Sequence, residues 1–291
     1  MTYTSTPVAT AIAAVIALGP GSTTISAQAT VDADNKYSHV GAIMVWRVDD
    51  AGRPIELRGF ASGTLIRDRV VVTAGHFTAP ATALGALPPS IKMFASFSPT
   101  DAKNPATWIP VIRQVTHPSM PHCPPPPQCD PTDEILVAPL EPGIADVGLV
   151  VLAYPPPGVG TARLAEFGTL ARSEGAPATI VGYGTTTPLD RTAPPDPMLW
   201  DGKRRIRRSL VRKVVDDTWA LWSIPSYVCS GDSGGGIFLP AAPGVANQEV
   251  LVANVSDGGV DCRRHNNNHR LDTSSIQQWI SETLRQLPAG R

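Results

Sequence analysis

Gly231-Asp232-Ser233-Gly234-Gly235 places a serine hydroxyl in a turn whose neighbouring residues are too small to block a substrate. Glycine at 231 and 234 allows backbone angles that a side chain would forbid, so that consecutive N–H groups can converge on one point beside the serine. An oxyanion would form at such a point. The stretch therefore indicates a nucleophilic serine, although Gly-Asp-Ser-Gly also occurs in ordinary surface turns.

Two upstream segments supply the partners that a nucleophilic serine needs. Val70 to Thr73 is a β-branched run that leads to His76, which predicts a buried strand delivering an imidazole to a loop. Asp146 stands at the mouth of the apolar strand Val147 to Leu152. Acyl transfer uses a hydroxyl that attacks, a base that takes its proton and an acid that orients the base. Histidine, aspartate and serine provide these three groups.

The ordered segments resemble the trypsin/chymotrypsin-like serine proteases over about residues 37 to 286. The landmarks are Ala61 to Ile66, Thr73 to His76, Ala145 to Leu149, Val181 to Gly184, Cys229 to Gly235, Val255 to Gly258 with Cys262, and Trp279-Ile280. The resemblance implies an all-β domain over residues 30–291, built from two six-stranded antiparallel β-barrels with a C-terminal α-helix. It also implies a serine endopeptidase that cleaves polypeptides through an acyl-enzyme.

The resemblance assigns a role to each residue of the site. Ser233 attacks the scissile carbonyl, His76 acts as general base and then general acid, and Asp146 orients the imidazole. The N–H groups of Gly231 and Ser233 form the oxyanion hole. Two alternatives remain open, a non-catalytic binding scaffold and an esterase with little proteolytic activity.

Substrate-binding residues carried over by the resemblance are Tyr227, Val228, Ser256, Asp257 and Gly258. Tyr227 falls where trypsin-like members place an aspartate that binds arginine or lysine, so that determinant is absent. Ser256 would bind the substrate backbone, and Asp257 replaces a usual tryptophan. Tyr227 with Val228 either makes a narrow, mostly apolar pocket or fills it.

The N-terminal residues resemble a signal peptide over residues 1–29. Residues 8–19 form an apolar stretch too short to span a bilayer comfortably, and small residues at 27 and 29 fit cleavage after Ala29. We therefore expect a secreted protein, extracellular or periplasmic, without stable membrane insertion after signal removal. A buried N-terminal segment is the alternative, because no lysine or arginine precedes the apolar stretch.

Asp232 raises a question of pairing. Family members bury this carboxylate and pair it with an amino group released by cleavage, but the expected mature start reads Thr30-Val31-Asp32-Ala33 instead of Ile-Val-Gly-Gly. A buried carboxylate without a partner is costly. We therefore expect another partner or a partly open loop, and activity without cleavage of an activation segment.

Four cysteines indicate an oxidising compartment. The resemblance pairs Cys229 with Cys262, which ties together two walls of the substrate pocket. Cys123 and Cys129 flank a short proline-rich stretch, so a small disulfide ring is their natural arrangement. Their spacing with the nearby histidines matches no zinc pattern, and we expect no metal or organic cofactor.

A formal net charge of −1 and 17% charged residues give no electrostatic argument for a nucleic-acid partner. The local exception is the basic segment Lys203 to Arg208, continued by Arg212-Lys213. Because Ile206 and Leu210 are interleaved with these charges, we favour a solvated β-hairpin over a surface that binds anions.

Apolar runs predict the strands of the two barrels, and a proline-rich insertion at 117–140 predicts a surface loop. The first barrel, about residues 37–153, is expected to use 40–46, 64–73, 109–115 and 147–153. The second, about 175–272, is expected to use 178–183, 205–215, 218–223, 235–239 and 249–255. Apolar residues at helical spacing predict a helix over 275–287, with Ser274 as its N-cap.

Overall fold

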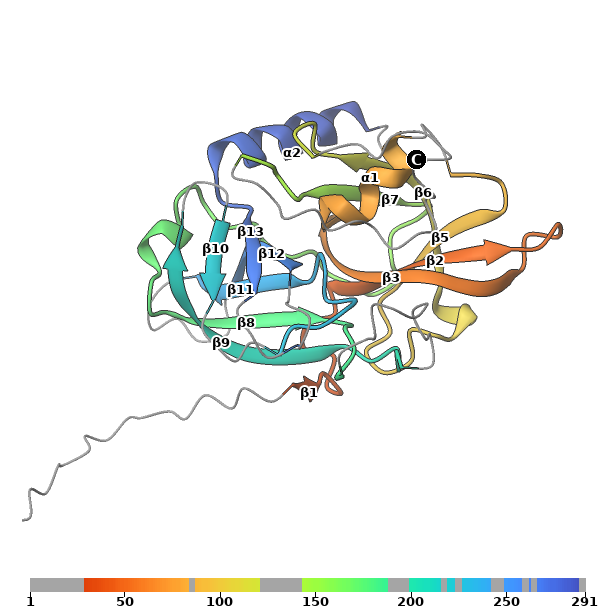
Figure 1. Ribbon diagram of the computed structural model, residues 1–291, viewed down its shortest axis with the longest axis horizontal. Coiled ribbons are helices and arrows are strands. Elements are labelled where there is room, and N and C mark those ends of the chain that lie inside the picture. Colours follow the sequence, from red (N-terminus) through yellow and green to blue (C-terminus); the bar gives the residue numbers. More distant parts are fainter. Residues whose placement is uncertain are drawn as a thin grey trace, which may run out of the picture.

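The structure, a computed structural model, describes residues 29–83, 87–120, 143–187, 199–215, 219–222, 227–241, 249–257, 262 and 266–287. Residues 1–28 of the expected signal peptide, the expected Cys123–Cys129 ring and Gly258 therefore lie outside the described residues. Figure 1 shows two groups of strands standing side by side, with the C-terminal helix α2 along one end of the molecule.

Six strands close the first barrel in the order β2-β3-β4-β7-β6-β5. Their bounds are β2 Val40–Val48, β3 Pro54–Arg67, β4 Val70–Thr73, β5 Ile91–Ser96, β6 Ile109–Thr116 and β7 Gly148–Leu152. Every residue of β4 and β7 is buried, as expected for continuous apolar, β-branched runs. These two neighbouring strands carry the chain to His76 and away from Asp146.

A second set of strands forms a sheet in the order β1-β9-β10-β13-β12-β11-β8. Their bounds are β1 Thr30–Val31, β8 Pro177–Gly182, β9 Arg205–Val214, β10 Trp219–Trp222, β11 Gly236–Pro240, β12 Glu249–Asp257 and β13 Asn267–Arg270. Strand β8 also pairs with β9, so the six strands from β8 through β13 form a ring. The short strand β1 pairs with β9 from outside this ring. The predicted fold of two six-stranded antiparallel groups is confirmed.

The helices that the structure describes are short. They are α1 Gly75–Ala83, α2 Ser274–Gln286 and the single 3₁₀ turns η1 Pro105–Thr107 and η2 Leu170–Arg172. Helix α2 buries Ile276 and Ile280 in the apolar core. Thr273, and not Ser274, is its N-cap, so the predicted start of the helix was one residue late. Among the described residues, no helix has both the length and the apolar character needed to cross a membrane.

Strand β9 corrects the expectation for the basic segment. The basic segment does form a strand, but Arg204, Arg205 and Arg207 are buried rather than solvated. Each guanidinium lies against a carboxylate of the chain, with N···O distances of 2.9 Å from Arg204 to Asp32 and 2.9 Å from Arg207 to Asp232. Buried arginines are tolerated where such pairs form.

Strands β1, β5 and β13 were not predicted, and the single strand expected at 64–73 is divided between the end of β3 and β4. The residues of β13 are Asn267, Asn268, His269 and Arg270, which have little intrinsic preference for a strand. Pairing with β10 on one side and β12 on the other imposes the extended conformation. Tertiary context therefore overrides local propensity at this position.

Candidate active site

His76 lies in the first turn of α1, directly after strand β4, where the sequence had predicted a loop. Strand pairing of Thr73 with Gly148 brings this turn beside the chain that leaves Asp146. A Cβ on Gly75 would lie 2.8 Å from the backbone nitrogen of Val147. Glycine at 75 therefore permits the close approach that joins the histidine and aspartate segments.

Asp146 holds His76 through two contacts. Its Oδ2 lies 2.9 Å from His76 Nδ1, and its Oδ1 accepts the backbone N–H of His76 at 2.7 Å. Ser256 Oγ also donates to Oδ2, and Asn254 Nδ2 donates to the Asp146 carbonyl at 3.2 Å. A carboxylate at Nδ1 keeps the proton on that nitrogen, which leaves Nε2 as the basic nitrogen of the imidazole.

The charges of this buried pair reinforce each other. Burial alone would raise the pKa of Asp146, but the His76 charge and the hydrogen bonds from His76 and Ser256 lower it to about 2. Burial alone would lower the pKa of His76, but the charge and hydrogen bond of Asp146, with the charge of Asp257, raise it above 6.5. Asp146 is therefore ionised at any pH near neutrality.

Ser233 is half-buried in a turn between two left-handed glycines, Gly231 with φ 89° and Gly234 with φ 78°. The turn is closed by the N–H of Asp232, which donates to Cys229 O at 3.0 Å, and that of Gly235, which donates to Asp232 O at 2.7 Å. Within the described part of the chain, the N–H groups of Gly231 and Ser233 donate to no protein acceptor. Two N–H groups of this turn, one on each side of the Asp232 N–H, are thus free of protein acceptors in the described part of the chain.

Ser62 in strand β3 anchors this turn, a role that sequence reasoning missed. Its N–H donates to Ser233 O at 2.8 Å, and its Oγ donates to Gly231 O at 2.8 Å. The same Oγ accepts the N–H of Tyr183 at 2.8 Å. One serine of the first barrel therefore fixes both carbonyls that flank Asp232. A polar residue among the small residues of a buried strand was the only sequence signal.

Gly234 brings the serine turn against the histidine segment. A Cβ on Gly234 would lie 2.2 Å from Thr73 Oγ1 and 2.7 Å from the backbone nitrogen of Ala74, which stands two residues before His76. The turn and the end of β4 are thus in direct backbone contact. His76 and Asp146 are joined by hydrogen bonds, and the Ser233 turn packs against the segment that carries His76.

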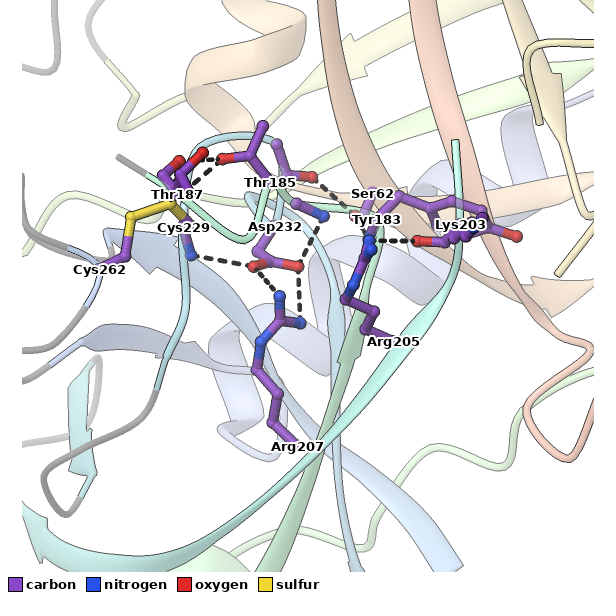
Figure 2. A network of polar contacts seen from close by, with 12 residues as sticks. Ser62, Tyr183, Thr185, Thr187, Lys203, Arg205, Arg207, Cys229, Asp232 and Cys262 are labelled. Carbon is purple, nitrogen blue, oxygen red and sulfur yellow. Dashed lines mark hydrogen bonds and ion pairs between the residues drawn. A yellow bond between two sulfur atoms is a disulfide. The ribbon is translucent and has the colours of Figure 1, made fainter. Parts of the chain in front are cut away.

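Asp232 has a partner inside the chain, Arg207 of strand β9. Its carboxylate also accepts the backbone N–H groups of Gly184 and Cys229, each at 2.9 Å. Figure 2 shows the guanidinium facing this carboxylate, close to the disulfide between Cys229 and Cys262. The expected alternative of a partly open loop is therefore not observed.

The remaining residues assigned to substrate binding are spread over different environments. Tyr227 has 37% of its surface exposed and a left-handed φ of 52°. Val228 is buried in the apolar core of the second barrel. Ser256 faces Asp146, and Asp257 at the end of β12 is half-buried. The predicted Cys229–Cys262 disulfide, which adjoins Tyr227 and Val228, is confirmed.

Comparison with known proteins rests on structure alone, since no protein-family profile and no curated protein matches the sequence. Human heparin binding protein superposes with a TM-score of 0.56 and 13% identity, covering 90% of this chain and 98% of that chain. HL collagenase superposes with a TM-score of 0.53 and 15% identity, covering 87% of this chain and 95% of that chain. Granzyme C superposes with a TM-score of 0.53 and 16% identity, covering 86% of this chain and 96% of that chain.

The chain has the trypsin/chymotrypsin-like serine protease fold. Identities of 13% to 16% limit this statement to the fold itself. The coverage shows that the likeness extends over both barrels of the protease fold and is not confined to one.

The contact at Gly234 predicts a large loss of stability for Gly234→Ala. The new Cβ would lie 2.3 Å from the carbonyl oxygen of Ser62, a backbone atom that cannot turn away. We expect the free energy of unfolding, measured by urea denaturation, to fall by more than about 3 kcal/mol. Gly168→Ala is the control, because Gly168 has φ 71° and its Cβ would meet only Arg172 Nη1 at 3.9 Å. A loss of about 1 to 2 kcal/mol is expected there, and equal losses at both sites would contradict the packing described.

The raised pKa of His76 predicts the pH dependence of any activity that uses it as a base. The imidazole must be neutral to accept a proton, so kcat/KM should rise with pH through a midpoint above 6.5. The pairing with Asp146 stabilises the protease fold most below pH 6.5, and this contribution is lost as the pH rises through the folded-state pKa.

Asp257→Asn tests the origin of that midpoint. The Asp257 charge is one cause of the raised pKa, so its removal should move the midpoint of kcat/KM to lower pH. The measurement is a pH series of initial rates for both proteins. A wild-type midpoint at or below 6.5, or no downward shift in Asp257→Asn, would contradict the electrostatic description.

Proposed function

We propose that this protein is a serine endopeptidase that hydrolyses polypeptides through an acyl-enzyme on Ser233. One observation carries the proposal. An imidazole held by an ionised, buried Asp146 lies in the segment against which the Ser233 turn packs, and among the residues that the structure describes no protein acceptor takes the N–H groups of Gly231 and Ser233. A base, a nucleophile and a site for negative charge are the three requirements of acyl transfer.

In the proposed reaction, Ser233 Oγ attacks the carbonyl carbon of the peptide bond while His76 Nε2 takes the hydroxyl proton. The carbonyl oxygen becomes negative and is bound by the N–H groups of Gly231 and Ser233. His76 then gives its proton to the leaving amine, which departs as the acyl-enzyme forms. Water attacks the ester by the same steps, with its proton passing through His76, and Ser233 is regenerated.

Asp146 supports both half-reactions without exchanging a proton. With its pKa lowered to about 2, it remains negative while His76 becomes positive. Its two hydrogen bonds to His76 also fix the ring orientation. These steps use side chains and backbone N–H groups of the protein, together with the substrate and one water molecule.

Polypeptide is the proposed substrate class, with Tyr227 and Asp257 as the groups that set its side-chain preference. Secretion is part of the proposal, supported by the Cys229–Cys262 disulfide and by the apolar N-terminal stretch at residues 8–19. Disulfides persist mainly in oxidising compartments.

The test is cleavage of a mixed peptide library by the purified protein, read by mass spectrometry. New peptide termini should appear with the wild type and be absent with His76→Ala, which removes the base. Turnover of activated esters without new peptide termini would favour an esterase instead. Neither activity in a folded protein would favour a non-catalytic binding scaffold.

A further inference from the structure

Arg204 stands directly before strand β9 of the second barrel and is completely buried. Its Nη1 lies 2.8 Å from the carbonyl oxygen of Val40, the first residue of β2, and 3.2 Å from that of Phe97, which follows β5. Its backbone N–H donates to Pro99 O at 2.8 Å. Strands β2 and β5 belong to the other group of strands (Figure 1). Arg204 therefore bonds three carbonyls on the side of the first barrel.

The charge of Arg204 is matched by Asp32. The distance from Arg204 Nε to Asp32 Oδ2 is 2.9 Å, and this carboxylate also accepts the backbone N–H groups of Lys36 and Tyr37, each at 2.9 Å. Nη2 of Arg204 donates to Asn35 Oδ1. Burial of a charge is tolerated where it is paired and hydrogen-bonded in this way. All three guanidinium nitrogens are therefore held by the chain.

Tyr183, which follows β8, connects Arg204 to the serine turn. Its hydroxyl accepts from Arg204 Nη1 at 3.2 Å and donates at 2.8 Å to Ser98 O, on the side of the first barrel. Its backbone N–H donates to Ser62 Oγ at 2.8 Å, and the Ser62 N–H donates to Ser233 O at 2.8 Å. Arg204 and the backbone of Ser233 are thus linked through two buried residues, each with contacts in both barrels.

The candidate site is itself divided between the barrels. His76 and Asp146 lie beside β4 and β7 of the first barrel, and Ser233 precedes β11 of the second. Tyr227 and Asp257, which are proposed to set the substrate preference, also belong to the second barrel. Proton transfer from Ser233 to His76 therefore depends on how one barrel sits on the other. A misplacement of about 1 Å can lower a rate about 100-fold.

A polar cluster fixes such an arrangement better than apolar contacts do. Apolar side chains of both barrels share one core, for example Met44 and Leu149 of the first with Val181 and Leu251 of the second. Hydrophobic contacts are non-directional, so they tolerate small shifts of one barrel against the other. The buried donors of Arg204 need their acceptors at defined distances and angles, because an unpaired buried group is costly.

We infer that Arg204 is a positioning residue, which fixes the second barrel on the first and so holds Ser233 at the separation from His76 that the reaction requires. The inference rests on the proposed function, since the arrangement of the barrels matters for catalysis only if these two residues react together.

The experiment compares Arg204→Met with Arg270→Met, using an activated ester as substrate. Arg270 is the matched control, because it is also buried and pairs at 2.9 Å with Asp272, which follows β13 of its own barrel. We expect kcat of Arg204→Met to fall about 100-fold. KM should change less than about threefold, because the substrate-binding groups of the second barrel stay together. Arg270→Met should keep kcat within about threefold of the wild type.

The split between kcat and KM distinguishes positioning from stability alone. A purely structural role would lower the thermal midpoint of both arginine variants and leave kcat per folded molecule unchanged. Circular dichroism at the assay temperature gives the folded fraction by which each rate is divided. We expect the loss in Arg204→Met to remain about 100-fold after this correction.

Two further variants cover the case in which Arg204→Met does not fold. Arg204→Met with Asp32→Asn removes both charges, so that neither is left buried without its partner. We expect this double variant to unfold cooperatively and to show the same loss in kcat, about 100-fold. Tyr183→Phe keeps the charge pair and the ring, and removes only the hydroxyl between Arg204 and Ser98. Its kcat should lie between those of the wild type and the double variant.

The outcomes separate this inference from the proposed function. A wild type without any Ser233-dependent turnover would defeat the proposed function itself. An active wild type with a folded Arg204→Met or double variant whose kcat stays within about threefold of that of Arg270→Met, the scatter between unrelated sites, would overturn the role of Arg204. Wild-type kcat in a folded Tyr183→Phe, or a loss that appears in KM and not in kcat, would overturn it as well.

Discussion

Replacing Ser233 with alanine is expected to lower kcat for peptide hydrolysis about a million-fold, the loss typical for the nucleophile of a triad. The substitution removes the only atom that forms the acyl-enzyme, while the turn itself stays in place. Its shape depends on backbone hydrogen bonds, such as Ser62 N–H to Ser233 O at 2.8 Å, and not on the hydroxyl. The thermal midpoint and KM should therefore remain near those of the wild type. Initial rates with a cleaved library peptide, together with calorimetry, provide the measurement.

Ser230→Ala is the matched control for that experiment. Ser230 lies in the same turn and its carbonyl accepts the N–H of Thr185 at 2.9 Å, a contact that alanine preserves. We expect kcat of Ser230→Ala to stay within about threefold of the wild type. A Ser233→Ala protein with more than a tenth of wild-type activity would show that another residue is the nucleophile.

Asp146→Asn is expected to lower kcat about ten-thousand-fold with little change in volume. Asparagine can present its NH₂ group to Nδ1, which would move the imidazole proton to Nε2 and remove the base. It also removes the negative charge that accompanies the positive imidazole in each half-reaction. The measurement is kcat of the variant with the same library peptide, with circular dichroism to establish that it folds.

The loss in Asp146→Asn should be accompanied by a change in the pH profile. The Asp146 charge and hydrogen bond are the main reasons why the pKa of His76 is raised despite burial, so residual activity should titrate at lower pH than in the wild type. A folded Asp146→Asn protein that lost less than tenfold in kcat would contradict the role given to this carboxylate.

The segments that carry His76, Asp146 and Ser233 could be predicted from the sequence because each has a local signature. The β-branched run before His76 forms the buried strand β4, and the apolar run after Asp146 contains β7. Glycines at 231 and 234 have the left-handed angles that the turn was expected to need. In each case neighbouring residues fix the local conformation.

The partner of Asp232 could not be predicted, because it depends on register between strands. Several arginines lie in the basic segment, and the apolar Ile206 suggested that its neighbours face solvent. The pairing of Arg207 with Ile180 instead turns Arg207 inward, toward a carboxylate 25 residues later in the chain. Ser62 was missed for the same reason, since its partners Gly231 and Ser233 come from the other barrel.

The most direct test of the central claim is labelling of the purified protein with a fluorophosphonate, followed by mass spectrometry of its peptides. The reagent reacts with an activated serine and needs little fit to a substrate pocket. We predict one phosphonyl group on Ser233 in the wild type, and loss of labelling in His76→Ala. No label on folded wild-type protein, or a label on a different residue, would contradict the proposal that Ser233, His76 and Asp146 form a working catalytic site.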